Sequence, residues 1–110
     1  MKLPNTDRAI VPVAKLRDYS LNTAHPEGKH KARVFRSALG FTVKDAERLR
    51  QMILDAILVN EATEQTSNAY GRRFVVDFNV TGMRGQVIVR STWLIRKDED
   101  FPRLTSCFIP

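Results

Sequence analysis

Cysteine and histidine are both scarce, because the 110 residues include one cysteine and two histidines. The single cysteine, Cys107, cannot form an internal disulfide, and this set of side chains is too small for a zinc site. Cys107 has no His or Asp at a diagnostic spacing, so we expect a buried small side chain in a strand rather than a nucleophile. No metal site is predicted, and no repeat or low-complexity tract is present.

Long hydrophobic runs are also lacking. No apolar run approaches the roughly 20 residues that a membrane-spanning helix needs. The start of the chain, residues 1–5, has one cation but no apolar segment typical of a signal peptide. We therefore expect a soluble protein that acts in the cytoplasm and not at a membrane. If the chain is part of a larger exported protein, its sorting signal would lie elsewhere.

The chain is basic, with 18 Lys and Arg against 12 Asp and Glu and a net charge of +6. Residues 1–40 carry eight cations against three carboxylates and residues 65–110 carry seven against four, whereas residues 41–64 are acidic. A length of 110 residues predicts one domain over residues 1–110. Cations concentrated toward both ends favour a polyanionic partner, although a basic balance can equally serve solubility.

Three helices are predicted in the first part of the chain, about residues 10–60. Pro12 is suited to a first helical position, and this helix should end near residue 21. After turn residues 22–28, a second helix should end at Gly40, which can adopt the left-handed conformation. Thr42 followed by Asp45 is close to a capping box for the third helix. Three-and-four spacing places Lys31, Val34, Phe35, Ala38 and Leu39 on one face of the second helix, and Ala46, Leu49, Met52, Ile53, Ala56 and Ile57 on one face of the third.

The second part, about residues 70–110, has the period of two that is typical of strands. Residues 61–68 are polar and are interpreted as a connection. Strands are predicted over residues 72–78, 86–95 and 103–109, with turns at 82–85 and 97–102. Short connections of this kind favour an antiparallel meander. The expected fold class is therefore α+β, with about three N-terminal helices packed on a small antiparallel sheet of three strands or slightly more.

Alternation within the strands assigns side chains to the two faces of the sheet. Trp93 is most simply a core residue, so Arg90 and Thr92 should lie on the opposite, polar face. In the last strand three residues share one face under regular alternation: Arg103, Thr105 and Cys107.

Both histidines lie in residues 25–36, beside several cations. A histidine can take or give a proton near neutral pH, which RNA cleavage through the 2′-hydroxyl requires. His30, in the first turns of the second helix, is the preferred acid or base, and His25 in the preceding turn is the alternative. The competing interpretation of each is a solvated polar residue or a hydrogen bond that stabilises the turn.

Cations and hydroxyls complete the predicted site. Lys29, Lys31 and Arg33 are candidates to bind phosphate, although a solvated helix face would show the same pattern. The strands add further candidates to contact RNA: Arg72, Arg90 and Thr92. Arg103 and Thr105 are candidate catalytic residues. A composite site of five residues would form if the second helix packs beside that sheet face: His30, Arg90, Thr92, Arg103 and Thr105.

Short motifs spread over nearly the whole chain carry a resemblance. They are Leu3-Pro4-Asn5, His25-Pro26-x-Gly28-x-x-Lys31-Ala32-x-x-Phe35, Leu39-Gly40-Phe41, Tyr70-Gly71, Thr92-Trp93-Leu94-Ile95 and Pro102-Arg103-Leu104-Thr105. With these motifs the chain resembles a family of uncharacterised small bacterial domains, which occur as free-standing proteins and as C-terminal domains of large toxin-like proteins. The free-standing members resemble one half of a toxin–antitoxin pair. Residues 106–110 depart from the aromatic-proline ending that is usual in such domains.

The expected order of helices followed by a small antiparallel sheet is also similar in architecture to the ribonuclease toxins grouped around barnase, RelE and EndoU. This resemblance implies metal-independent cleavage of RNA, without a cofactor, by a toxin that a small, acidic antitoxin-like protein covers. The alternative is a non-catalytic basic binding module that forms a complex with a small partner protein. The oligomeric state is not specified by the sequence.

Overall fold

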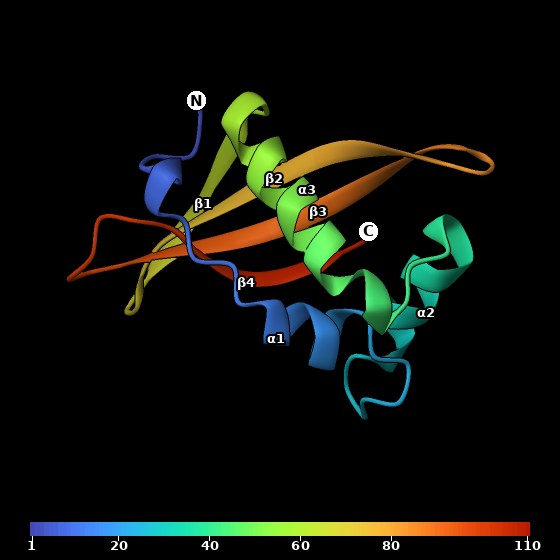
Figure 1. Cartoon of the computed structure of the whole chain (residues 1–110). Helices are drawn as coiled ribbons and strands as arrows, with labels where there is room; N and C mark the ends of the chain where they lie inside the picture. The colour runs from blue at the N-terminus through green and yellow to red at the C-terminus, as the bar shows by residue number, and fades with distance from the viewer.

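The protein, described here over all 110 residues by a computed structural model, has the expected α+β fold (Figure 1). The helical elements are η1 (Thr6–Arg8), α1 (Val13–Lys15), η2 (Leu16–Ser20), α2 (Lys29–Leu39), η3 (Val43–Asp45) and α3 (Ala46–Val59). The strands are β1 (Ala62–Asn68), β2 (Gly71–Gly82), β3 (Gly85–Arg96) and β4 (Arg103–Phe108). All neighbouring strands are antiparallel and follow chain order, which confirms the predicted meander.

The third helix begins and packs as its sequence predicts. The Thr42 hydroxyl accepts a hydrogen bond from the Lys44 N–H at 3.3 Å, and the Asp45 carboxylate accepts one from the Thr42 N–H at 2.8 Å. These bonds satisfy N–H groups that have no partner inside the helix. Gly40 adopts the left-handed conformation that separates α2 from this helix, with φ 71°. The buried side chains of α3 all come from the predicted apolar face: Ala46, Leu49, Ile53, Ala56 and Ile57.

The second helix is rotated relative to the predicted face, which is confirmed only in part. Phe35 is buried and Leu39 packs against the core as predicted, but Ala32 is buried too, whereas Lys31 is exposed and Val34 is 41% exposed. A Cβ atom added to Gly28 would lie 2.7 Å from the Tyr19 carbonyl oxygen. The start of α2 therefore approaches η2 more closely than any side chain would permit. This contact joins two different elements, so three-and-four spacing within the second helix could not reveal it.

The polar segment before the first predicted strand is itself a strand. Residues 61–68 were expected to be a connection, but β1 pairs with β2 from Ala62 onward, with Thr63 opposite Val75. Every side chain of β1 after Ala62 is exposed. A sheet edge that faces solvent on both sides needs no apolar alternation, so the sequence carries no strand signal there.

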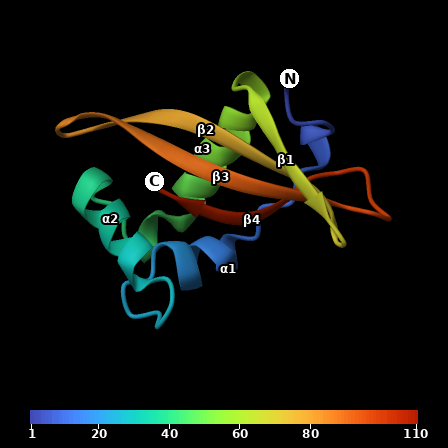
Figure 2. The same ribbon diagram turned by 180° about the vertical axis from the view of Figure 1, so that it is seen from behind.

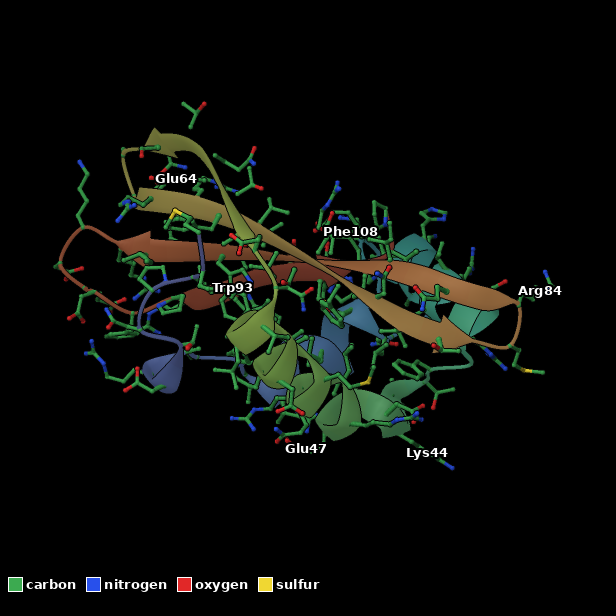
Figure 3. All side chains as sticks on the ribbon, turned by 90° about the horizontal axis from the view of Figure 1, so that it is seen from above. Lys44, Glu47, Glu64, Arg84, Trp93 and Phe108 are labelled. Carbon is green, nitrogen blue, oxygen red and sulfur yellow. The ribbon has the colours of Figure 1, made fainter.

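Helix α3 lies across one face of the sheet, and the opposite face is open (Figures 1 and 3). The core lies between α3 and the sheet face that it covers, and includes Phe74, Val76, Val89 and Trp93. Trp93 is 1% exposed, which confirms that it is a core residue. Its indole N–H donates to the Ser91 hydroxyl at 2.9 Å, and that hydroxyl donates to the Val76 carbonyl at 2.7 Å. The polar atoms beneath the helix are thus satisfied.

A bulge in β4 changes which of its side chains face the core. Thr92 pairs with Ser106 and Trp93 with Leu104, so Thr105 is an extra residue on this strand. Cys107 consequently lies opposite Ser91 on the helix-covered face, and burial raises the pKa of its thiol to about 12. The expectation that Arg103, Thr105 and Cys107 share one face is therefore wrong for Cys107. Its predicted burial in a strand is confirmed.

Strand β4 forms the sheet edge nearest the first helices (Figure 2). The Ile10 N–H donates to the Pro102 carbonyl, and the Leu104 N–H donates to the Ile10 carbonyl, both at 2.9 Å. This short parallel bridge attaches the segment before α1 to the outer edge of β4. The N-terminal segment, η2 and β4 are thereby held side by side, which positions the site described next.

Candidate functional site

A hollow of about 460 Å³ lies where η2, the turn before α2 and the β4 bulge meet. We call it the basic hollow, because Lys15, His25 and Lys31 line it from three different segments. The remaining polar residues of its wall are Asp18, Tyr19, Thr105 and Ser106. Two residues that were predicted for the site from the helical part, His25 and Lys31, therefore meet a third from the last strand, Thr105.

His25 is held by the turn in which it lies. Its Nδ1 atom accepts hydrogen bonds from the backbone N–H groups of Glu27 and Gly28, both at 3.0 Å. Its ring also packs edge-on against Tyr19, with centroids 4.6 Å apart. Because Nδ1 accepts these bonds, Nε2 carries the imidazole hydrogen and can donate a hydrogen bond. His25 therefore stabilises the turn, as one interpretation expected, and it also lines the basic hollow.

Two lysines from different helices approach β4 at the basic hollow. Lys15, at the end of α1, donates from Nζ to the Thr105 carbonyl at 3.3 Å. Lys31, in the first turn of α2, places Nζ 4.3 Å from the centroid of the Phe108 ring. An ammonium group has three donor hydrogens, so each lysine keeps donors for an anion in the hollow. The neighbouring protein groups hold these long side chains near the strand edge.

Three hydroxyl groups form a cluster beside the lysines. The Thr92 hydroxyl lies 2.6 Å from that of Thr105 and 2.7 Å from that of Ser106. The bulge makes this possible, because it brings two successive β4 residues to the same Thr92 side chain. The sequence predicted Thr92 and Thr105 as neighbours but did not select Ser106. All three residues are half-buried, and two of them line the basic hollow.

Asp18 is the single carboxylate in the wall of the basic hollow. It accepts a hydrogen bond from the Arg17 Nε at 2.9 Å, and this bond holds the pKa of Asp18 below its usual range. Asp18 is therefore ionised at neutral pH. Its charge is paired with that of Arg17, so the two lysines give the wall a positive balance toward an anion.

His30 lies outside the basic hollow, on the exposed surface of α2. Arg33 is also exposed and Lys29 is half-buried, and neither contributes to the wall. The composite site predicted around His30 is therefore not assembled. Helix rotation explains this, since the face carrying Ala32 and Phe35 turns inward and carries His30 and Arg33 away from β4.

The three predicted strand arginines are each held by a carboxylate. Both Nε and Nη2 donate in the Arg72–Glu64, Arg90–Asp77 and Arg103–Glu99 pairs, at distances between 2.8 and 3.0 Å. The bond from Arg103 holds the pKa of Glu99 below its usual range, and the bond from Arg72 does the same for Glu64. Arg103 lines a second hollow that adjoins the basic hollow, because Thr105 belongs to the walls of both.

Sequence reasoning missed Lys15, Asp18, Tyr19 and Ser106 as site residues. The first three belong to the segment that β4 holds through the Ile10 bridge. The available signal was the basic charge of residues 1–40, which includes Lys15. Their meeting with β4 is a contact between the two ends of the chain, which local patterns do not encode.

No group of three or more His, Cys, Asp or Glu side chains is arranged to hold a metal ion. The structure also contains no helix with the length and apolar character needed to cross a membrane.

Comparison with protein families places the chain in a family whose function is unknown. Residues 2–110 match a family described as a domain of unknown function, DUF6883. The chain belongs to this family, which is consistent with the resemblance to small uncharacterised domains. Curated proteins gave no match, and neither did solved structures.

Proposed function

We propose that this protein is an RNA-cleaving toxin domain that acts on a phosphodiester bound in the basic hollow. The observation that carries the proposal is the convergence of Lys15, Lys31 and His25 on one hollow beside the β4 hydroxyls. Donors of this kind suit a phosphate group, which carries negative charge on several acceptor oxygens. The resemblance of the sequence motifs to toxin-like domains is consistent with the same assignment.

The proposed reaction is metal-independent transesterification. The RNA 2′-oxygen attacks phosphorus, the bond to the 5′-oxygen breaks, and a 2′,3′-cyclic phosphate forms. Asp18 takes the proton of the 2′-hydroxyl, and one of the two lysine ammonium groups gives a proton to the departing 5′-oxygen. The hydrogen bond between the His25 Nε2–H and a phosphoryl oxygen stabilises the charge that develops there.

This assignment gives His25 a different task from the one expected of a catalytic histidine. Proton transfer through Nε2 would require Nδ1 to carry a hydrogen. That hydrogen would point at the backbone N–H groups of Glu27 and Gly28, which now donate to Nδ1. The turn therefore favours His25 as a fixed donor rather than as an acid or base. Proton transfer falls to Asp18 and the lysines.

The same set of side chains in the basic hollow also favours a second function, which is binding of a polyanion without cleavage. A His25 whose Nδ1 is occupied by the turn N–H groups and an Asp18 whose pKa is lowered are both poorly suited to proton transfer, while the cations still attract a polyanion. The protein would then be a basic binding module, whose partner is RNA or a small acidic protein. In the first function, a small acidic antitoxin-like protein would block the basic hollow by covering it.

Single-turnover cleavage of labelled tRNA and mRNA in EDTA tests the proposal. Two variants, Lys31→Gln and His25→Asn, each remove one donor from the basic hollow, and the Asn oxygen can still accept the turn hydrogen bonds. Loss of one such donor typically costs about 10²–10³ in rate. His30→Asn is the matched control and should cleave like the parent protein.

Each outcome has a distinct meaning. Cleavage that depends on Lys31 and His25 but not on His30 supports the proposal. Cleavage that His30→Asn abolishes would place the chemistry on the outer surface of α2 and contradict the proposed site. Binding of RNA without cleavage, with or without added magnesium, would leave the binding module as the function.

A further inference from the structure

Two more hollows continue from the basic hollow toward the far end of the sheet. The first, of about 170 Å³, shares Lys15 and Thr105 with the basic hollow and extends to Arg103 and Arg96. The second, of about 400 Å³, shares Arg96 with the first and ends between the β1–β2 and β3–β4 connections. Those two connections lie together at one end of the sheet (Figure 1). The three adjoining hollows are here called the β4 groove.

The β4 groove is richer in cations than in carboxylates. Six cations line it, distributed over its whole length: Lys31, Lys15, Arg103, Arg96, Lys97 and Arg72. Three carboxylates line it: Asp18, Glu99 and Asp100. A row of cations of this kind attracts the backbone of a nucleic acid irrespective of its sequence.

The cations of the groove remain available to phosphate. Arg96 lies 3.9 Å from Glu99, at the limit of an ion pair, and Lys97 forms no ion pair. Both side chains are exposed. Arg72 is paired with Glu64 in a pair that is open to solvent, and such pairs contribute little stability, so a phosphate can compete for its guanidinium group. Arg103 binds the largely buried Glu99 through Nε and Nη2, which leaves its Nη1 donors for a phosphate.

The course of the β4 groove suits a single strand rather than a duplex. Its middle hollow includes Leu94 and Arg103, on the open face of the sheet, whereas its far hollow includes Pro4 and the buried Ile95, which lies with Trp93 on the helix-covered face. Duplex nucleic acid is stiff over about 150 base pairs, so following this change of direction would cost bending energy. A flexible single strand can follow it without that cost.

Base stacking is not the main source of affinity in this groove. Tyr19 lines the basic hollow, but its ring packs edge-on against His25. Phe101 and Phe108 are not part of the walls, and each has a cation over one face, namely Arg103 and Lys31. Phosphate contacts therefore supply the binding energy, and recognition is tolerant of sequence.

We infer that the β4 groove holds single-stranded RNA over its full length, with the reacting phosphate in the basic hollow and the neighbouring nucleotides along Arg103, Arg96 and Lys97. The inference rests on the proposed function for the position of the reacting phosphate. The strand path itself is a matter of binding, and it is tested without any cleavage.

Fluorescence anisotropy with labelled, non-cleavable single-stranded DNA tests this path. The variant R96Q/K97Q removes two charges from the far part of the groove. The control K44Q/R84Q removes the same charge from the opposite end of the molecule (Figure 3). Oligonucleotides from about 4 to about 16 nucleotides should bind the parent protein more tightly as length increases. R96Q/K97Q should abolish this gain and reduce the slope of log K against log salt by about 1.4.

The control variant should keep both the length dependence and the slope of the parent protein, apart from a uniform loss of affinity. Equal effects of the two variants would overturn the inference and leave only general electrostatic attraction. Absence of binding at every length, or a preference for duplex, would overturn it too, and binding only to an acidic protein would point to that partner instead. Length-dependent binding without RNA cleavage would uphold the groove while refuting the proposed reaction.

Discussion

His25 shows how a turn can determine what a side chain is able to do. Pro26 restricts the residue before it to extended geometry, and the two N–H groups that follow are then donated to Nδ1. The remaining nitrogen, Nε2, is the one free to act in the basic hollow that His25 lines. His30, five residues later, has no such restraint and also no polar neighbours from β4. The two histidines thus differ in position and in chemistry, although their sequence contexts are similar.

Glu99 gives a prediction for the pH dependence of stability. Its side chain is 16% exposed and accepts two hydrogen bonds from Arg103, which hold its pKa below the usual range. A carboxyl whose folded pKa is depressed stabilises the fold above its unfolded value of about 4.3 and loses that contribution as the pH falls. Urea unfolding should therefore show Glu99→Gln to be less stable than the parent at pH 7, with the difference shrinking toward pH 3.

The control for this measurement is Asp98→Asn. Asp98 is an exposed neighbour of the same charge that forms no ion pair within 4.0 Å. Its replacement should change stability less than Glu99→Gln at neutral pH. A Glu99→Gln difference that stays constant from pH 7 to pH 3 would refute the electrostatic account and leave only a packing effect.

Among the elements, α3 is the one that local chemistry determines most completely. Its capping box, its apolar face and the glycine before it all agree with one another. Thr42→Ala should lower the free energy of unfolding by about 1 kcal/mol, because the hydroxyl that accepts the Lys44 N–H is lost. Thr42→Ser keeps that acceptor and should be close to the parent in urea unfolding. Equal loss in both variants would show that packing of the Thr42 methyl group matters, not the cap.

The sequence predicted the elements whose signals are local and failed where a contact between distant segments decides the outcome. Strands β2, β3 and β4 and the glycine-bounded turn between β2 and β3 follow from alternation and turn residues. The edge strand β1 has no apolar face to mark it, and the β4 bulge moves Cys107 to the core without any local signature. Rotation of α2 likewise depends on the approach of Gly28 to Tyr19.

The candidate site was predicted in part for the same reason. His25, Lys31 and Thr105 were selected from residue type, and the structure brings them together. His30, Lys29 and Arg33 were selected on the same grounds and lie elsewhere. Lys15 could not be selected, because its role depends on a bridge between Ile10 and Arg103, 93 positions apart in the chain.

At the scale of the molecule, the distribution of charge along the chain becomes a distribution in space. The basic residues 1–40 and the basic residues 65–110 meet along β4. The acidic residues 41–64 include α3, which covers one face of the sheet (Figure 1). Bringing the two basic parts together concentrates cations along the β4 groove. The proposed function depends on this meeting more than on any single residue.

The imidazole signals of the two histidines provide the most direct test of the central claim, which is that phosphate binds in the basic hollow. The measurement is an NMR titration of the labelled protein with a non-cleavable single-stranded oligonucleotide. Our account predicts that the Nε2 resonance of His25 shifts and saturates while that of His30 stays in place, and that Lys31→Gln weakens the effect. A shift of His30 alone, or of neither histidine at saturating oligonucleotide, would contradict it.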